Sequence, residues 1–259
     1  MIMEYRPFVV SAKPEYFHEV SIPNVNPRDT VDISVAVPEG ATAIIIFCYG
    51  GSLDFHRWRS LLLLQKFFKA GYGIAFFDYR GMNASSGSNI FFEHTGLHTR
   101  IIDTQYILVY LACHYPKLKQ ILWGHSMGGH IAACLSAEPL VSRVILSAPG
   151  AFSSVLVDRK IPFGENFRKI LRQPGSWMDS ESFEILKQSN VPLLLFTFED
   201  DAIIPFEVTE TYFMFAANKK KRHVIISGEH GGTFECYSAS EDRREQLVEI
   251  ACNWMSDDS

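Results

Sequence analysis

Several features that would assign a class at once are absent from this sequence of 259 residues. No apolar run approaches the roughly 18 residues that a membrane-spanning helix needs, so we expect no membrane span. Residues 1–10 include Glu4, Arg6 and Pro7 and lack the apolar segment of a signal peptide, which predicts a cytoplasmic protein. Lysine and arginine number 24 against 29 acidic residues, and the lack of a basic excess argues against nucleic acid as a partner.

Cysteine is also scarce, and its distribution suggests neither a disulfide framework nor a metal site. The 5 cysteines are odd in number, scattered and without a CxxC pair: Cys48, Cys113, Cys134, Cys236 and Cys252. This pattern is typical of reduced thiols, and we expect no metal and no cofactor. Because no repeat, low-complexity tract or Pro/Gly/Ser-rich linker divides the chain, residues 1–259 are predicted to form a single domain.

What the sequence does contain is a regular alternation of short apolar runs and helical patterns. Hydrophobic residues make up 47% and charged residues 20%, the balance of a globular protein. After two lead-in strands, strands alternate with helices, which predicts an α/β fold with a mostly parallel, twisted sheet of about eight strands flanked by helices. The expected strands are Tyr16–Ile22, Thr30–Val37, Ala43–Cys48, Gly73–Phe77, Gln120–Trp123, Val144–Leu146, Val191–Phe198 and His223–Ile226. The expected helices are Trp58–Ala70, Thr95–Tyr115, Met127–Ala137, Phe206–Ala217 and Ser240–Trp254.

A candidate nucleophile follows the strand Gln120–Trp123. The sequence there is Gly124-His125-Ser126-Met127-Gly128, a G-x-S-x-G pattern between a strand and a helix. In this context the serine lies on a sharp, strained turn that exposes its hydroxyl, and the small residues on both sides avoid collisions with the neighbouring strand and helix. We therefore predict Ser126 as the nucleophile, and we expect the neighbouring His125 and His130 to be structural.

With these motifs the chain resembles the α/β-hydrolase superfamily, nearest the serine-hydrolase branch of monoacylglycerol lipases, lysophospholipases and related esterases and peptidases. The resemblance implies an acid and then a histidine further along the chain. The segment after Val191–Phe198, Glu199-Asp200-Asp201-Ala202-Ile203-Ile204-Pro205, resembles the family's D-x-[IV]-[IV]-P loop and aligns Asp201 with the acid, with Asp200 as the alternative. The loop Ser227-Gly228-Glu229-His230-Gly231-Gly232 follows the last strand and places His230 as the base.

The resemblance also implies an oxyanion hole made by two backbone N–H groups. One belongs to Met127, the residue after the nucleophile. The loop Tyr49-Gly50-Gly51-Ser52 resembles the family's H-G-x loop and makes Gly51 the second donor. Tyr49 departs from the usual histidine, and because the donor is a main-chain amide, this change is expected to affect the anchoring of the loop or the pocket wall rather than abolish catalysis.

Substrate choice in this superfamily usually depends on a cap inserted after the sixth strand. The interval at about 151–190 is rich in apolar residues and predicts a short cap or lid, although it also fits an irregular connection that only covers the sheet. An apolar lid favours an acyl or aromatic group and hence a small-molecule carboxylic ester or thioester, of which we expect the ester. A thioesterase and a serine aminopeptidase or acyl-peptidase share the same triad and remain alternatives, as does a non-catalytic binding protein on the same fold. The sequence does not indicate an oligomeric state.

Overall fold

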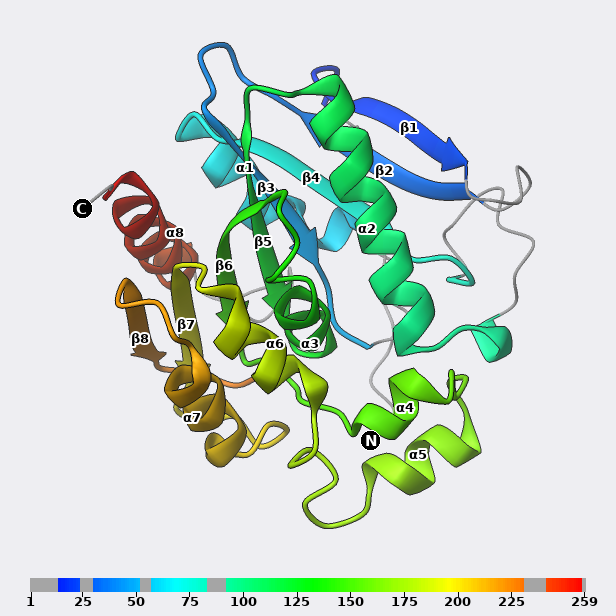
Figure 1. Cartoon of the computed structure of the whole chain (residues 1–259). Helices are drawn as coiled ribbons and strands as arrows, with labels where there is room; N and C mark the ends of the chain where they lie inside the picture. The colour runs from blue at the N-terminus through cyan, green and yellow to red at the C-terminus, as the bar shows by residue number, and fades with distance from the viewer. Residues whose placement is uncertain (1–13, 24–29, 52–56, 83–91, 231–240, 258–259) are drawn as a thin grey trace, which may run out of the picture.

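Eight strands form one sheet at the centre of the protein (Figure 1). The computed structural model describes residues 14–23, 30–51, 57–82, 92–230 and 241–257. The strands are β1 (His18–Pro23), β2 (Thr30–Ala36), β3 (Ala43–Cys48), β4 (Gly73–Asp78), β5 (Lys119–His125), β6 (Val141–Ser147), β7 (Leu193–Phe198) and β8 (Lys221–Ile226). Every residue of β3, β4 and β7 is buried, as expected for strands that are covered on both faces.

The order of the strands across the sheet is β1-β2-β4-β3-β5-β6-β7-β8. The pairs β1–β2 and β2–β4 are antiparallel, and every later pair is parallel. The prediction of a mostly parallel sheet of about eight strands with an antiparallel lead-in is therefore confirmed. The carboxyl ends of β3, β5, β7 and β8 consequently meet at one edge, where ligands bind in sheets of this kind.

Helices cover both faces of the sheet. Helices α1 (Leu61–Lys69) and α8 (Glu241–Ser256) contact each other on one face, and a 3₁₀ turn, Arg57–Ser60, precedes α1. Over the other face, α2 (Leu97–His114), α3 (Met127–Cys134), α6 (Glu181–Ser189) and α7 (Phe206–Phe215) contact one another in series (Figure 1). A second 3₁₀ turn, Phe92–His94, leads into α2. No helix in the described ranges is long and apolar enough to cross a membrane.

The main differences from the predicted boundaries concern the strands around the candidate nucleophile. β5 runs to His125, beyond the predicted end at Trp123, because Gly124 pairs with Cys48 and Leu146, and His125 pairs with Ser147. The apolar run of the sequence ends at Trp123, whereas the pairing of the strand with its neighbours continues through Gly124 and His125. The nucleophile turn thus begins inside the sheet, which fixes its position.

The interval after β6 contains three helices: α4 (Ser154–Asp158), α5 (Glu165–Leu171) and α6. α6 packs on α3 and α7 and belongs to the layer over the sheet, so only α4 and α5 form a cap over its carboxyl edge (Figure 1). The cap packs against the start of α2 through an apolar cluster separate from the main core, which we call the apolar cap cluster: Leu97 of α2 with Phe152, Leu156, Phe163 and Phe167. In the interval of about 151–190, for which a short cap is predicted, α4 and α5 are thus the helices at the carboxyl edge of the sheet.

Candidate active site

Ser126 lies on the turn between β5 and α3 in a conformation that non-glycine residues rarely adopt. Its φ is 55° and its ψ is −121°, and a conformation of this kind stores on the order of 1–3 kcal/mol. Three backbone hydrogen bonds hold it in place. The N–H of Ser126 donates to the carbonyl of Ser147 at 3.0 Å, and its own carbonyl accepts from the N–H groups of Gly129 at 2.9 Å and Gly150 at 2.8 Å. The surrounding backbone thus determines where the serine hydroxyl projects.

The glycines on both sides of the turn are required by close packing. A Cβ on Gly124 would lie 2.2 Å from the carbonyl oxygen of Gly128, and a Cβ on Gly128 would lie 2.0 Å from the carbonyl oxygen of Cys48. Real Cβ atoms do not approach other atoms this closely. α3 can therefore rest directly on β3 and β5 only with glycine at both positions, and this contact keeps Ser126 at the sheet edge.

Ser126, His230 and Asp201 form a continuous line of hydrogen bonds. The Oγ of Ser126 lies 2.9 Å from Nε2 of His230, and Nδ1 of His230 lies 2.8 Å from Oδ2 of Asp201. Because the carboxylate can only accept, Nδ1 carries the proton, and Nε2 is left to accept from the serine hydroxyl. The structure thus brings together three residues that are 104 and 29 positions apart in the chain.

The acid beside His230 is Asp201 rather than Asp200. The Oδ1 atom of Asp201 accepts from the N–H groups of Ile203 at 2.8 Å and Ile204 at 2.9 Å, so the carboxylate is oriented by its own loop. Asp200 is exposed and makes no such contact with His230. Burial alone would raise the pKa of Asp201, but the hydrogen bonds from His230, Ile204 and Ile203 outweigh burial and lower it. Asp201 is therefore a stable anion.

His125 lies beside His230, a neighbour that the sequence reasoning missed. The two ring centroids are 5.1 Å apart, and Nδ1 of His125 donates to the carbonyl of Ser147 at 3.1 Å. Burial lowers the pKa of His125 to about 3, and repulsion by His230 acts in the same direction. His125 is thus neutral, so it does not oppose a positive charge that forms on His230.

The loop after β3 lies against the nucleophile turn. A Cβ on Gly50 would lie 3.1 Å from Cβ of Ser126, and a Cβ on Gly51 would lie 2.8 Å from Cε of Met127. The two predicted oxyanion donors, Gly51 and Met127, are therefore neighbours across this contact. Tyr49 is buried, and its hydroxyl accepts from the N–H of Tyr79 at 3.3 Å, so it anchors the loop to the segment after β4. Ser52 and Gly231–Gly232 lie outside the described residues.

A second polar cluster, His130, Cys134 and Glu181, lies between α3 and α6. Its ligand-type atoms are within 4.8 Å of one another, and among the described residues this is the set with the spacing of a metal site. Burial lowers the pKa of His130 to about 3 and raises the pKa of Cys134 well above its ordinary value. Within α3, the neutral imidazole of His130 contacts the protonated thiol of Cys134 at 3.5 Å, and this thiol donates to Oε1 of Glu181 on α6 at 3.9 Å. These hydrogen bonds account for the cluster as a contact between α3 and α6.

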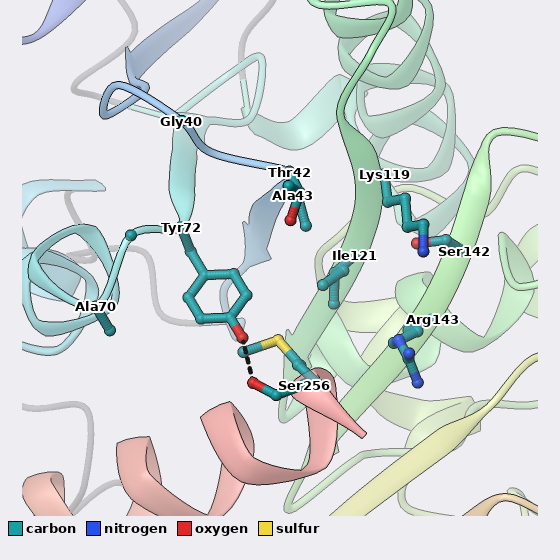
Figure 2. A pocket seen from close by; sticks show the side chains of 12 residues that line it. Gly40, Thr42, Ala43, Ala70, Tyr72, Lys119, Ile121, Ser142, Arg143 and Ser256 are labelled. Atoms are coloured by element: carbon teal, nitrogen blue, oxygen red, sulfur yellow. Dashed lines mark hydrogen bonds between the residues drawn. The ribbon is translucent and has the colours of Figure 1, made fainter. Parts of the chain in front are cut away.

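A hollow of about 310 Å³ lies at the opposite end of the sheet, at the amino ends of the strands (Figure 2). Its lining includes Thr42, Tyr72, Lys119, Ser142 and Arg143, and the hydroxyls of Tyr72 and Ser256 lie 3.3 Å apart beside it. None of the predicted site residues lines this hollow. The hollow is therefore separate from the line of Ser126, His230 and Asp201.

The sheet order and the strained serine turn are typical of the α/β-hydrolase fold. The profile of the alpha/beta hydrolase fold family matches residues 43–198, more than half of the chain, and the chain belongs to this family. Among solved structures, the apo form of Thermogutta terrifontis esterase 2 is similar with a TM-score of 0.70 at 17% identity, covering 96% of this chain and 97% of that one. A predicted CIB-like hydrolase from Thermoplasma acidophilum has a TM-score of 0.64 at 19% identity, covering 92% and 97% of the two chains.

Two curated relatives are longer than this chain, which matches only part of each. The chain is 28% identical over 204 residues to Protein bem46 of Schizosaccharomyces pombe, covering 76% of this chain and 64% of that protein. It is 23% identical over 220 residues to the lysophosphatidylserine lipase ABHD12 of Danio rerio, covering 79% and 54%. The chain thus spans between about half and two thirds of these two relatives.

Proposed function

We propose that the protein is a serine hydrolase that cleaves carboxylic esters through an acyl-enzyme intermediate on Ser126. The observation that carries the proposal is the hydrogen-bonded line from Ser126 through His230 to Asp201, with contacts of 2.9 Å and 2.8 Å. Both distances are in the range required for proton transfer between a nucleophile, a base and an orienting acid. The similarity to an esterase fold and to a lysophosphatidylserine lipase supports this class of chemistry.

In the first step, the Oγ of Ser126 attacks the ester carbonyl while Nε2 of His230 takes the hydroxyl proton. Asp201 holds the imidazole in the required tautomer and stabilises the imidazolium. The N–H groups of Gly51 and Met127 donate to the tetrahedral oxyanion. His230 then returns the proton to the leaving alcohol as the C–O bond breaks, and an acyl-serine remains. Water repeats the sequence and releases the carboxylic acid and free Ser126.

The cap supplies the argument for an acyl group in the substrate. Met127, directly after the nucleophile, packs against the apolar cap cluster of Leu97, Phe152, Leu156, Phe163 and Phe167. A substrate group that extends from the reacting carbonyl toward the cap therefore meets aliphatic and aromatic side chains. This surface favours an alkyl or aromatic acyl chain over a charged peptide terminus.

The nucleophile is tested by labelling with a fluorophosphonate probe, which reacts with activated serines. Wild-type protein is expected to be labelled, and the Ser126→Ala variant is expected to lose labelling and ester hydrolysis together. Ser142→Ala is the matched control, because Ser142 is a serine on β6 whose hydroxyl donates to the carbonyl of Gln120 at 2.7 Å, far from the site. Labelling that survives Ser126→Ala would contradict the assignment.

The substrate class is tested by a panel of p-nitrophenyl esters of increasing chain length, acyl-CoA thioesters and aminoacyl anilides. We expect the highest kcat/KM for an ester, with a rise from acetyl to longer acyl chains because the cap cluster contacts the acyl group. A preference for acyl-CoA would identify a thioesterase, and a preference for anilides would identify a peptidase. Either result would overturn the ester assignment and leave the nucleophile assignment intact.

A further inference from the structure

A buried arginine on α2 connects the two halves of the proposed oxyanion hole. Arg100 is 2% exposed, and its Nη1 donates to the carbonyl of Gly50 at 3.1 Å and contacts Sδ of Met127 at 3.3 Å. Gly50 precedes one predicted oxyanion donor, Gly51, and Met127 is the other. One guanidinium group therefore contacts both segments that supply the donors, which no motif in the sequence indicates.

The geometry of the peptide bond explains what this contact does. The carbonyl of Gly50 and the N–H of Gly51 belong to one planar, trans peptide unit, in which the two groups point in opposite directions. Fixing the carbonyl toward Arg100 therefore fixes the N–H of Gly51 on the other side. A glycine pair without Cβ atoms has little steric resistance to rotation of this peptide plane, so an external contact is needed to hold it.

We infer that Arg100 is a positioning residue that orients the oxyanion donor of Gly51, an inference that rests on the proposed hydrolase function. Arg100 acts through the Gly50–Gly51 peptide unit and not on the substrate, so its effect is on how the oxyanion donor is positioned. In the absence of Arg100, the N–H of Gly51 samples orientations that do not stabilise the transition state, so the rate of the chemical step falls.

Arg100 is itself held rigidly. Its guanidinium lies 4.7 Å from the ring centroid of Tyr79 and 4.7 Å from that of Phe163. Among the described residues no carboxylate forms a salt bridge with Arg100, and the nearby Asp103 forms its salt bridge with Arg80. Burying a guanidinium without a carboxylate partner is unfavourable. Two aromatic faces and a carbonyl acceptor compensate for this, an arrangement that needs the planar group of arginine and not the compact ammonium of lysine.

Phe163 extends this connection to the cap. It belongs to the apolar cap cluster, and its N–H donates at 2.7 Å to the carbonyl of Thr95, two residues before the start of α2. The ring that packs on Arg100 is therefore supplied by the part of the protein that is proposed to contact the acyl chain. Through this contact, the position of the cap and the orientation of the Gly51 amide depend on the same side chain.

The test compares Arg100→Met and Arg100→Lys with the control Arg143→Met. Arg143 is also buried and also lies over an aromatic ring, at 5.4 Å from Trp254, and it donates to a carbonyl, that of Asp257, at 3.3 Å. It lies at the opposite end of the sheet, so Arg143→Met reproduces the loss of a buried guanidinium without touching the site. Each variant is assayed for kcat and KM on the preferred p-nitrophenyl ester, for binding of an alkylboronic acid and for thermal unfolding.

We expect Arg100→Met to lower kcat by roughly 10², with a change in KM of less than about threefold. The alkylboronic acid forms a tetrahedral anion on the serine, so its affinity is expected to fall in parallel with kcat. Arg100→Lys is expected to recover part of the loss, since it keeps the charge but not the planar group. Arg143→Met is expected to leave kcat within about twofold of wild type, although its Tm changes about as much as that of Arg100→Met.

Other outcomes separate the two proposals. A wild-type protein that hydrolyses esters, with Arg100→Met unchanged in kcat and in boronic acid affinity, would overturn the role of Arg100 alone. A loss of kcat in Arg143→Met that matches the loss in Arg100→Met would show that the effect is general destabilisation, and would overturn it as well. A wild-type protein that neither hydrolyses the ester panel nor binds the boronic acid would contradict the proposed hydrolase function, and the Arg100 inference with it.

Discussion

The two ends of the sheet use similar side chains in different surroundings. At the carboxyl end, Arg100 lies between two aromatic rings and contacts the nucleophile turn; at the amino end, Arg143 lies over Trp254 beside an open hollow of about 310 Å³ (Figure 2). Both guanidinium groups are buried and both stack on aromatic rings. A buried arginine is therefore not by itself a sign of function, and the distinction depends on which backbone groups it contacts.

The two ends of the sheet also differ in backbone strain. At the amino ends of the strands, the described residues with positive φ are Gly40, Gly71 and Asn190, which adopt this conformation at little energetic cost. At the carboxyl ends they include Ser126 and Ala148, for which positive φ is unfavourable. Strain of this kind persists only where surrounding contacts enforce it, and it is typical of functional sites. The carboxyl end thus holds the strained backbone as well as the hydrogen-bonded line of side chains.

The largest effect is expected from adding one methyl group at the carboxyl end. Gly128→Ala places a Cβ 2.0 Å from the carbonyl oxygen of Cys48, so α3 must move away from β3. We expect the free energy of unfolding to fall by about 3 kcal/mol or more and fluorophosphonate labelling to be lost.

The amino end supplies the control for this substitution. Gly71→Ala meets no atom within 4 Å but keeps a φ of +92°, so we expect it to lower the free energy of unfolding by about 1–2 kcal/mol without changing labelling. Urea unfolding and probe labelling measure both effects. Wild-type labelling of Gly128→Ala would show that the close contact is not required.

A large but more local effect is expected at the acid loop. Asp201→Asn keeps the shape of the side chain but removes the charge and favours the wrong tautomer of His230, so kcat is expected to fall about 10⁴-fold. Asp200→Asn is the matched control, because this neighbouring residue is exposed. We expect it to change kcat less than about twofold. Equal losses in the two variants, measured on the same ester, would contradict the role proposed for Asp201.

The smallest effect concerns the response of stability to acid. The pKa values of His125 and His130 are lowered to about 3 by burial, from an ordinary value of 6.5. Between pH 6.5 and about 3 the unfolded chain binds protons that the folded protein does not. Each buried histidine therefore lowers the free energy of unfolding by up to about 1.4 kcal/mol per pH unit as the pH falls through this window.

His130→Gln removes one of the two buried histidines. We therefore expect the free energy of unfolding to fall less steeply with decreasing pH, by about the contribution of one histidine to the slope, whatever the effect of the substitution on stability at pH 7. His114→Gln is the control, since His114 is exposed at the end of α2 near the amino end of the sheet, and it should leave the slope as in wild type. Urea unfolding at intervals between pH 4.5 and 7 measures the slope. An unchanged slope in His130→Gln would show that this histidine is not held neutral by burial.

The strands and the nucleophile turn could be predicted from local sequence, for a physical reason. The uninterrupted apolar runs of β3, β4 and β7 can be stable only between two covered faces, so they predict buried parallel strands. Gly124 and Gly128 around Ser126 predict the turn, because the close contacts of that turn exclude any Cβ. The boundaries were less accurate where backbone pairing extends past the apolar residues, as at Gly124 and His125 of β5.

The sequence by itself therefore determined the alternation of elements and the nucleophile turn, since each depends on neighbouring residues. The candidates for acid and base came from the resemblance of two loops to the hydrolase family. Only the tertiary structure decided which of two adjacent aspartates meets His230, that His125 lies beside it, and that Arg100 contacts both oxyanion segments. These are contacts between residues far apart in the chain, and they depend on how the loops after different strands converge at one edge of the sheet. Local pattern contains no information about that convergence beyond the order of the strands.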